Sequence, residues 1–382
     1  MRGTGMAHRY SVGFVGGGQV ARSHAIGFAN VPLFFAGADT AEMKVVAEAS
    51  DALARSAAEK LGFPAWTSDW RQVTRDPAVE VVDVMTPTYL HREPAIDALE
   101  HGKAVICEKP LATTEKDARE MYEVAMRTGG RTLVGFNYRR VPAVTLAKEM
   151  IARGDLGRVN HVRSHFMEDW GGPQFPLTWR FRPQQAGAGA LADLGSHAID
   201  MVRFLVGEPL EVCGATANFV PERTVPGAEG KGKEPSEVDD VTAAVMRLEG
   251  GAIAEVGASW VATGRKVALD FEVHGDGGTV AFTMERPNEL QFYSSRDGKE
   301  ARGFRTIYFG PAHTYGETLI FSSPTMGTGY VDSVVAQMHD FLKSLSGGEE
   351  YAPSFRDGWR VNRIIEAVLE SSRKRAWVGV GA

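Results

Sequence analysis

The sequence has little cysteine, no long apolar run and no excess of positive charge. Two cysteines among 382 residues are too few for a disulfide framework or a cysteine-bound zinc. No apolar run approaches the roughly 18 residues that a membrane span needs, and no secretory signal precedes the first strand. A net charge of -6 argues against nucleic-acid or anionic-membrane partners. We therefore expect a cytoplasmic protein, and the length suggests about two domains.

The first third of the chain alternates apolar strand patterns with helical ones. This alternation predicts a parallel, doubly wound sheet. We expect it to form an N-terminal Rossmann dinucleotide-binding domain over residues 8–136. Its strands are predicted at 11–15, 44–47, 79–85, 104–107 and 132–136. The helices predicted between them include 51–61 and 89–100.

A glycine motif follows the first predicted strand. Residues 16–21 read Gly-Gly-Gly-Gln-Val-Ala, and a helix is predicted over 19–30. Gly16 permits a tight turn, Gly18 lets a pyrophosphate approach the backbone, and a small residue at 21 lets helix and strand pack closely. The helix N-terminus at Gln19 and Val20 offers N–H groups to the phosphates. The alternative is a glycine-rich strand–helix turn without a ligand, but the flanking strand and helix favour a dinucleotide site.

Glu48 ends the second predicted strand, about 30 residues after the glycines. The usual spacing is ~20 residues, and a loop inserted over 31–40 would explain the difference. A carboxylate here accepts hydrogen bonds from ribose hydroxyls and repels a 2′-phosphate. We therefore expect NAD rather than NADP, against the alternative of a solvated charge at a strand end.

Lys109 stands at the carboxyl end of the strand predicted over 104–107. It follows Glu108 and precedes Pro110, and proline favours an extended conformation at the residue before it. Ligands of open parallel sheets bind at the carboxyl ends of the strands. We expect Lys109 to face a nicotinamide and a sugar-like alcohol, whereas the alternative is a Glu–Lys pair on the surface.

The strongest signal of the second half lies in residues 187–208, where apolar residues recur at helical spacing. Asp193 and His197 are four residues apart, so they are neighbours on one face of the predicted helix, with Asp200 on nearly the same stripe. Histidine is a base at neutral pH, and a nearby carboxylate orients it. A single histidine on a helix is usually structural, and Asp with His can also hold a metal. The glycine motif and Lys109 favour hydride transfer, so no metal is expected.

Aromatic residues gather between 170 and 181, where they either stack on a sugar or nicotinamide ring or fill the core. We favour a site role for Trp179 and leave Trp170, Phe175 and Phe181 open. Residues 221–235 look like an insertion. Strand patterns then follow one another over 241–309, which predicts a large open, mostly antiparallel sheet. Its second face needs a cover, so a homodimer or homotetramer is expected.

Several of these motifs together resemble the glucose–fructose oxidoreductase / inositol dehydrogenase family (Gfo/Idh/MocA), over nearly the whole chain. The resemblance implies a Rossmann domain followed by a C-terminal α+β domain, here 137–382. From the sequence pattern itself we expect the last helix to pack back on the first domain. The motifs that carry it are Gly16 to Ala21, Thr86-Pro87, His91, Glu108-Lys109-Pro110, Gly135 to Arg139, Trp179-Arg180 and Asp193 to His197.

The resemblance also implies roles for individual residues. Lys109, Asp193 and His197 take the catalytic positions. The remaining positions are implied to bind the cofactor: Thr86, Pro87, His91 and Glu108 line the nicotinamide ribose, Asn137 lies beside cofactor and substrate, and Trp179 with Arg180 covers the cofactor.

The expected function is reversible oxidation of a secondary hydroxyl on a cyclic polyol, sugar or sugar derivative by hydride transfer to NAD(P). His197 would accept the hydroxyl proton, and Lys109 would stabilise the developing charge on the same oxygen. Two alternatives are a catalytically silent sensor of sugar and dinucleotide, and a glycoside-cleaving enzyme that oxidises its substrate transiently.

Overall fold

The chain folds into two compact units. The structure, a computed structural model, describes residues 7–227, 232–319, 327–347 and 351–381. Unit 1 comprises Met1–Ala112, Lys116–Arg140 and Gly329–Trp359, and unit 2 comprises Thr113–Glu115, Val141–Thr328 and Arg360–Ala382. The segment Gly329–Trp359 thus belongs with the N-terminal unit, although it lies near the end of the chain.

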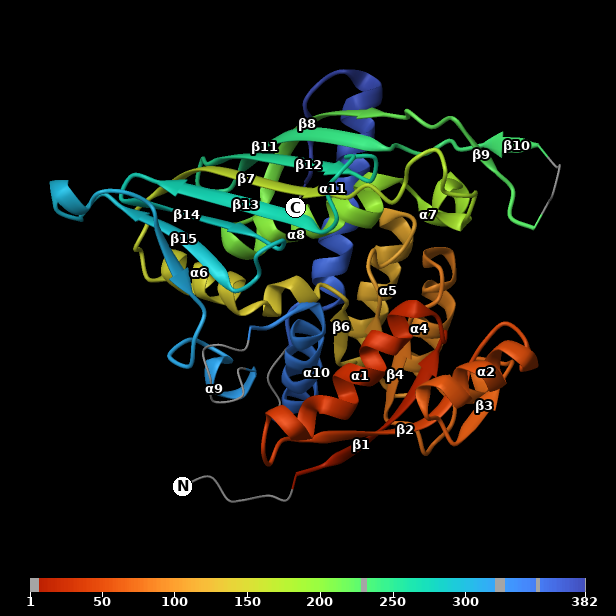
Figure 1. The fold of residues 1–382 in the computed structure, drawn as a ribbon. Helices are drawn as coiled ribbons and strands as arrows, with labels where there is room; N and C mark the ends of the chain where they lie inside the picture. Colours follow the sequence, from red (N-terminus) through yellow and green to blue (C-terminus); the bar gives the residue numbers. More distant parts are fainter. Residues whose placement is uncertain (1–6, 228–231, 320–326, 348–350, 382) are drawn as a thin grey trace. The chain divides into compact units, whose positions relative to one another are not determined.

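Unit 1 is built on a six-stranded parallel sheet, counted over the described residues (Figure 1). The strand order is β3-β2-β1-β4-β5-β6, which is the Rossmann order. The predicted Rossmann domain is therefore confirmed. The strands are β1 (Arg9–Val15), β2 (Thr40–Ala47), β3 (Ala65–Thr67), β4 (Val81–Val84), β5 (Ala104–Cys107) and β6 (Thr132–Val134).

Helices connect the strands of this sheet. Helix α1 buries Ala21, His24, Phe28 and Val31 along one face, and α10 packs against it. Gly27 permits this approach, because a Cβ there would lie 2.9 Å from Val334 of α10. The helical segments are α1 (Gln19–Phe34), α2 (Asp51–Leu61), α3 (Arg71–Thr74), η1 (Thr88–Leu90), α4 (Arg92–Glu100), α5 (Glu115–Thr128), η2 (Asn137–Arg140) and α10 (Tyr330–Gly347).

Two predictions about this unit were wrong in detail. The loop predicted over 31–40 is shorter, because α1 continues through Pro32 to Phe34 and β2 begins at Thr40. The single helix predicted over 89–100 is divided into the 3-10 turn η1 and helix α4, with His91 at their junction. The short β3 and α3 were not predicted, since each is too brief to show a period.

Unit 2 is built on a nine-stranded sheet in its described residues, in the order β16-β15-β14-β13-β7-β12-β11-β8-β17. Among the described strands of this sheet, only the pairing of β7 with β12 is parallel, so the predicted mostly antiparallel sheet is confirmed. The strands are β7 (Val159–Met167), β8 (Pro209–Ala217), β11 (Val241–Leu248), β12 (Ile253–Ser259), β13 (Ala268–Gly275), β14 (Gly278–Thr283), β15 (Glu289–Ser294), β16 (Arg305–Tyr308) and β17 (Val378–Gly379).

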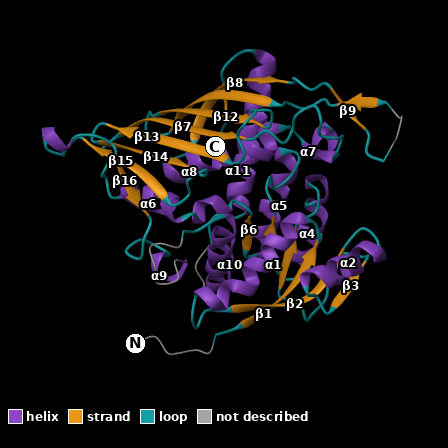
Figure 2. Cartoon of the chain, in the orientation of Figure 1, coloured by secondary structure: helices purple, strands orange, loops and turns teal. Residues whose placement is uncertain are grey.

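One face of this sheet is covered by helices. Helix α8 packs on β7, β12 and β13, and α6 packs on β14 and β15 (Figure 2). Along β11, buried residues alternate with exposed ones, because successive side chains point to opposite faces. The helical segments are α6 (Pro142–Ala152), η3 (Trp179–Phe181), α7 (Pro183–Ala186), the π-helix η4 (Leu191–Gly195), α8 (Ser196–Leu205), η5 (Lys299–Ala301), α9 (Gly316–Leu319) and α11 (Phe355–Lys374), whose first residues belong to unit 1.

The segment predicted to be an insertion forms a small hairpin. Strands β9 (Glu222–Thr224) and β10 (Lys233–Pro235) pair in a separate antiparallel sheet. Residues 228–231 of the predicted insertion lie outside the described residues.

Candidate active site

The carboxyl ends of the unit 1 strands lie in register. Val15 pairs with Ala47 on one side and Val84 on the other, Val84 pairs with Cys107, and Cys107 pairs with Val134. The loops that follow these residues therefore share one edge of the sheet. In order along the edge they begin with Glu48, Gly16, Met85, Glu108 and Gly135. Strands β1 and β4 flank the switch point of the strand order, where dinucleotides bind in this architecture.

The glycine loop has room for a pyrophosphate at one position. Gly16 has φ 103, and a Cβ there would lie 2.8 Å from the Met85 carbonyl carbon. At Gly18, by contrast, a Cβ would meet no atom within 4 Å. Gly18 is also the N-cap of α1, whose first turn has no acidic residue. Gln19 and Val20 begin the helix beside this space. Open space at a helix N-terminus fits the anionic diphosphate of a dinucleotide.

The Glu48 carboxylate is held against the glycine loop. One oxygen accepts the Gly17 N–H at 2.7 Å, and the other accepts the Ala49 N–H at 3.0 Å. The side chain is half-buried at the end of β2. This arrangement orients a carboxylate beside the loop, as a ribose partner requires, and its role toward the cofactor stays a prediction.

The loop after β4 carries Thr86, Pro87 and His91. The Thr86 hydroxyl oxygen is buried and has no hydrogen-bond partner among the described residues, so a ligand or water can satisfy it. His91 is buried, with Nε2 2.8 Å from the Thr86 carbonyl and Nδ1 3.3 Å from that of Leu111. Burial lowers the pKa of His91, which favours a neutral ring. His91 thus ties the loop after β4 to the segment that follows Pro110.

The end of β5 rests on a buried cluster of charges. His24 Nδ1 lies 2.7 Å from Asp83 Oδ2, and its Nε2 lies 3.2 Å from Glu108 Oε1. Burial disfavours the charged ring, but the two carboxylates more than offset it and raise the pKa of His24 to about 10. Glu108 Oε2 accepts the Lys109 N–H at 3.2 Å. We call His24, Asp83 and Glu108 the His24 cluster; it lies directly behind Lys109.

Asn137 follows the last strand of unit 1 and is buried. Its amide nitrogen donates to the Ser333 hydroxyl at 2.8 Å. The contact joins the predicted cofactor side chain to α10, the segment that returns to this unit from late in the chain.

In unit 2 the predicted helix over 187–208 was wrong in its first part. Residues Leu191–Gly195 form a π-helix, and the α-helix begins only at Ser196. The buried Asp239 carboxylate accepts the N–H groups of Gly189 and Leu191 at 2.7 and 2.8 Å. These bonds hold the start of the helix, and single π turns of this kind occur frequently at functional sites. Asp193 lies in this turn.

His197 and Asp200 lie in the regular helix α8. The His197 side chain is almost fully buried, and its ring centroid lies 5.8 Å from that of Phe166. Asp200 is fully buried and lies 3.9 Å from Arg203. Asp200 therefore belongs to an ion pair of the unit interior, whereas Asp193 keeps an exposed fraction of 20%.

Trp179 and Arg180 form the 3-10 turn η3. The Arg180 guanidinium lies over the Trp179 ring at 4.4 Å, and its Nε lies 3.9 Å from Asp193 Oδ1. The structure thus brings together three of the predicted residues within unit 2. The Thr178 and Ser196 hydroxyls are buried with no hydrogen-bond partner in the described residues, and each precedes a predicted site residue in the sequence.

The other aromatic residues of this region form a core. Phe181 is fully buried, and Trp170, Phe175 and Trp260 surround it with centroid distances of 6.1, 6.0 and 5.2 Å. The question that the sequence left open is therefore answered for Phe181, which fills the interior of unit 2.

Comparison with known proteins agrees with this geometry. Residues 10–136 match the model of an oxidoreductase family with an NAD-binding Rossmann fold, and residues 144–281 match the GFO/IDH/MocA C-terminal domain. Levoglucosan dehydrogenase of Pseudarthrobacter phenanthrenivorans is 43% identical over 97% of this chain and 98% of its own length. The chain belongs to the Gfo/Idh/MocA family.

Two further relatives show the range of this family. Inositol 2-dehydrogenase of Rhizobium meliloti is 26% identical and covers 96% of this chain and 98% of its own. A solved structure titled levoglucosan dehydrogenase in complex with NADH and levoglucosan has a TM-score of 0.95 at 42% identity, over 98% of this chain and 100% of that one. The predicted membership is confirmed, and the chain is an NAD-dependent oxidoreductase of the Gfo/Idh/MocA family.

Several buried residues near the Gfo/Idh/MocA motifs were missed from the sequence. His24 occupies the apolar face of α1, and Asp83 interrupts an otherwise apolar strand; a charge in such a pattern was the available signal. Arg223, in the predicted insertion, is fully buried and donates to the carbonyls of Gly171 and Gly172. No local pattern marks it, because these two carbonyls are about 50 residues away in the sequence and its carboxylate partner, Asp240, is 17 residues away.

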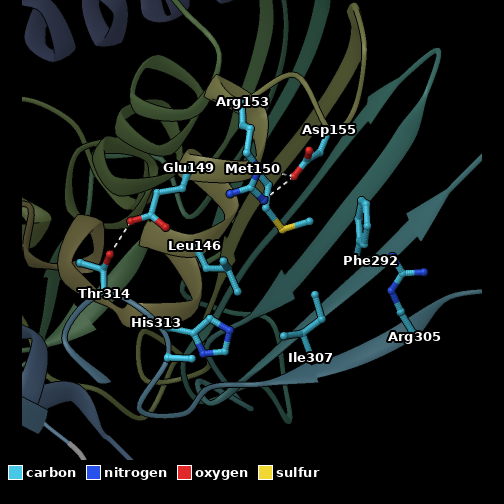
Figure 3. Close-up of a pocket in the computed structure, with 11 residues that line it drawn as sticks. Leu146, Glu149, Met150, Arg153, Asp155, Phe292, Arg305, Ile307, His313 and Thr314 are labelled. Carbon is cyan, nitrogen blue, oxygen red and sulfur yellow. Dashed lines mark hydrogen bonds and ion pairs between the residues drawn. The ribbon is translucent and has the colours of Figure 1, made fainter. Parts of the chain in front are cut away.

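A separate cavity of about 430 Å³ lies between α6 and strands β15 and β16 (Figure 3). It contains none of the predicted site residues. Its polar rim is already paired, since Thr314 donates to Glu149 and Arg153 binds Asp155. In the described parts of the chain there is no group of three potential metal ligands, and no helix there could span a membrane.

Proposed function

We propose that this protein oxidises one secondary hydroxyl of a cyclic anhydrosugar of the levoglucosan type, with inositols and simple sugars as weaker substrates. The similarity to levoglucosan dehydrogenase over nearly the whole length of both chains carries this proposal. Over a similar length, inositol 2-dehydrogenase is 26% identical and glucose-6-phosphate 3-dehydrogenase 25% identical, which favours the anhydrosugar.

The proposed roles of the residues follow from their chemistry. When bound, NAD⁺ would supply the acceptor for the hydride that leaves the substrate carbon. His197 accepts the hydroxyl proton, so the alcohol becomes a ketone as the C–H and O–H bonds break. The Lys109 ammonium donates a hydrogen bond to the same oxygen and stabilises its developing negative charge. Asp193 binds another hydroxyl of the ring, and Arg180, which lies 3.9 Å from Asp193, covers the cofactor together with Trp179.

The cofactor side of the proposal is supported by the edge of the unit 1 sheet. The space at Gly18 fits a diphosphate, the Glu48 carboxylate fits ribose hydroxyls, and the buried Thr86 hydroxyl has bonding capacity to spare. A carboxylate at Glu48 repels a 2′-phosphate, so we expect NAD⁺ to be preferred over NADP⁺.

A substrate panel tests the proposed function. Levoglucosan, myo-inositol, scyllo-inositol and glucose are each mixed with NAD⁺ or NADP⁺, and NADH is followed by its absorbance. We expect the highest kcat/KM for levoglucosan with NAD⁺. No NADH with any compound would overturn the proposal, and product release from a glycoside without net NADH would indicate transient oxidation instead.

Variants of the two central residues separate chemistry from binding. Lys109→Met and His197→Ala should each lower kcat by a factor of 10² or more, about 3 kcal/mol of transition-state stabilisation. NADH affinity should change little. Because both side chains act on one oxygen, kcat of the double variant should fall by a factor far smaller than the product of the two single-variant factors. An effect of tenfold or less for Lys109→Met would leave the lysine a binding role only.

We also propose that the chain assembles into a homodimer or homotetramer through the face of the nine-stranded sheet that α6 and α8 do not cover. Charges of both signs lie side by side there, as in the Arg163–Glu272 pair at 2.8 Å and the His161–Glu255 pair at 3.1 Å. A surface with both signs is complementary to a second copy of itself. Light scattering should give two or four times the monomer mass, and Arg163→Glu should weaken the assembly.

A cytoplasmic location is proposed as well. Cys107 and Cys213 are free thiols, which suits a reducing compartment. Fractionation of the producing cells would test it, and recovery outside the cytoplasm would overturn it.

A further inference from the structure

The loop that carries Lys109 is held in place by a series of polar contacts among buried side chains. Glu108 uses both carboxylate oxygens: Oε1 faces His24 Nε2 at 3.2 Å, and Oε2 accepts the backbone N–H of Lys109 at 3.2 Å. His24 uses both ring nitrogens, since Nδ1 faces Asp83 at 2.7 Å. A continuous series of contacts therefore links Asp83, in the middle of β4, to the backbone nitrogen of Lys109.

Burial shields these polar contacts from water. The exposed fractions of the side chains are 3% for His24, 0% for Asp83 and 13% for Glu108. The Glu108 carboxylate lies against Gly135, which follows β6, and only glycine permits this approach because a Cβ there would overlap the carboxylate. An ion pair with so little access to water is hardly screened by salt.

The charges balance only when the ring is protonated. A positive His24 and Lys109 offset the negative Asp83 and Glu108, whereas a neutral ring leaves two buried carboxylates facing one ammonium. Burial raises the pKa of Asp83, and the contact with His24 opposes that rise. The interaction with His24 and the charge of Lys109 bring the pKa of Glu108 below its ordinary value, although burial acts in the opposite direction. Loss of the ring proton would therefore free Glu108 to move toward Lys109.

We propose that His24 is a positioning residue for the oxidation, because as a cation it holds the Glu108 carboxylate and, through it, sets the place of Lys109. This inference rests on the proposed function, in which Lys109 contacts the reacting oxygen. His24 touches neither substrate nor cofactor in this scheme. It acts only through Glu108, so its removal changes turnover without removing a ligand-binding group.

Kinetics across pH test the proposal, with each variant expressed as a ratio of its kcat to that of the parent enzyme. His24→Asn should lower kcat at least tenfold at every pH between 6.5 and 9.5. Asp83→Asn leaves the ring with Glu108 alone, so the pKa of His24 falls. Its ratio should be near one at pH 6.5 and should fall at least tenfold by pH 9. Flat ratios near one for both variants would overturn the proposal.

The ratio of the variant kcat to the parent kcat distinguishes the titration of His24 from that of neighbouring groups. Other titratable groups that interact electrostatically with Asp83 or Glu108 are Cys107, Lys109, His91 and Tyr330. These groups are present in parent and variant alike. The control is His8→Asn, which removes an exposed histidine 2.9 Å from Glu80 and should give a ratio of one throughout. A purely structural role of His24 would lower the melting temperature of Asp83→Asn with no dependence of the kcat ratio on pH.

A second measurement does not need activity. Hydrogen exchange of a peptide that contains Lys109 should be at least tenfold faster in His24→Asn than in the parent or in His8→Asn. Unchanged exchange would overturn the inference. If the parent reduces no NAD⁺ with any sugar, the proposed function fails, and the exchange experiment still decides whether His24 holds this loop.

Discussion

The two units each bury a cluster of opposite charges, and the two clusters use different cations. The His24 cluster in unit 1 uses an imidazolium, whose charge depends on its surroundings. In unit 2 the cation is Arg223, whose NH2 lies 3.2 Å from Asp240 and whose guanidinium lies 3.7 Å from the Phe181 ring. We call Arg223, Asp240 and Trp260 the Arg223 cluster, since Trp260 donates to Asp240 at 2.6 Å.

The two clusters differ in whether the charge of the cation depends on its surroundings and on pH. A guanidinium keeps its charge at any physiological pH, although burial lowers the pKa of Arg223. It holds the carbonyls of Gly171 and Gly172 and so shapes the loop next to the predicted site residues of unit 2. The imidazolium of His24 is a cation only because two carboxylates contact it. We expect the His24 cluster to govern turnover and the Arg223 cluster to govern stability.

The largest effect is expected from removal of the permanent cation. Arg223→Met leaves the buried Asp240 carboxylate without its cationic partner, which should cost about 3–5 kcal/mol of unfolding free energy. Urea denaturation measures this loss. The matched control is Arg127→Met, because Arg127 and its ion-pair partner Glu100 are 63% and 47% exposed. A change within about 1 kcal/mol is expected there, and equal losses would contradict the comparison.

The next effect concerns pH. The folded-state pKa of His24, about 10, lies above its ordinary value of 6.5. Its contribution to stability is therefore complete below pH 6.5, declines as pH rises and is lost above about pH 10. The unfolding free energy should fall by about 1 kcal/mol per pH unit between 7 and 9 from this group alone. His24→Asn should remove that slope, whereas Arg223→Met should leave it in place.

The smallest effect is expected from crowding the His24 cluster without removing a charge. In Gly135→Ala the new methyl group overlaps Glu108 Oε1, and overpacking of this kind costs about 1–3 kcal/mol. Turnover should fall as well, because Glu108 is displaced beneath Lys109. The control is Gly298→Ala, where a Cβ meets no atom within 4 Å. Thermal unfolding and kcat measured together would show whether the displaced carboxylate matters.

Much of unit 1 could be predicted from its residues, because its signals are local. The strand over 104–107 and the helix over 51–61 have the predicted bounds, since each has a clear period and a nearby stop, such as Gly62 after the helix. The division near His91 and the extension of α1 through Pro32 were missed. Both depend on packing with neighbouring elements rather than on propensity.

The site was only partly predictable for the same reason. The residues after the strand ends were found, because the carboxyl edge of a parallel sheet is where ligands bind. The buried partners behind them were not found. His24 and Asp83 are 59 residues apart in the sequence, and the π-helix at Asp193 depends on Asp239, about 50 residues further along.

The sequence by itself determined the family, the Rossmann unit, the preference for NAD and the identity of the expected reacting groups. Each of these depends on residues that are close together in the chain. The tertiary structure decided which charges are buried against one another, and therefore which histidine is a cation and which is neutral. His24 and His91 are both fully buried, yet His24 contacts two carboxylates and His91 contacts two carbonyls. Only the folded surroundings of an imidazole set its charge, because the free side chain titrates close to neutral pH.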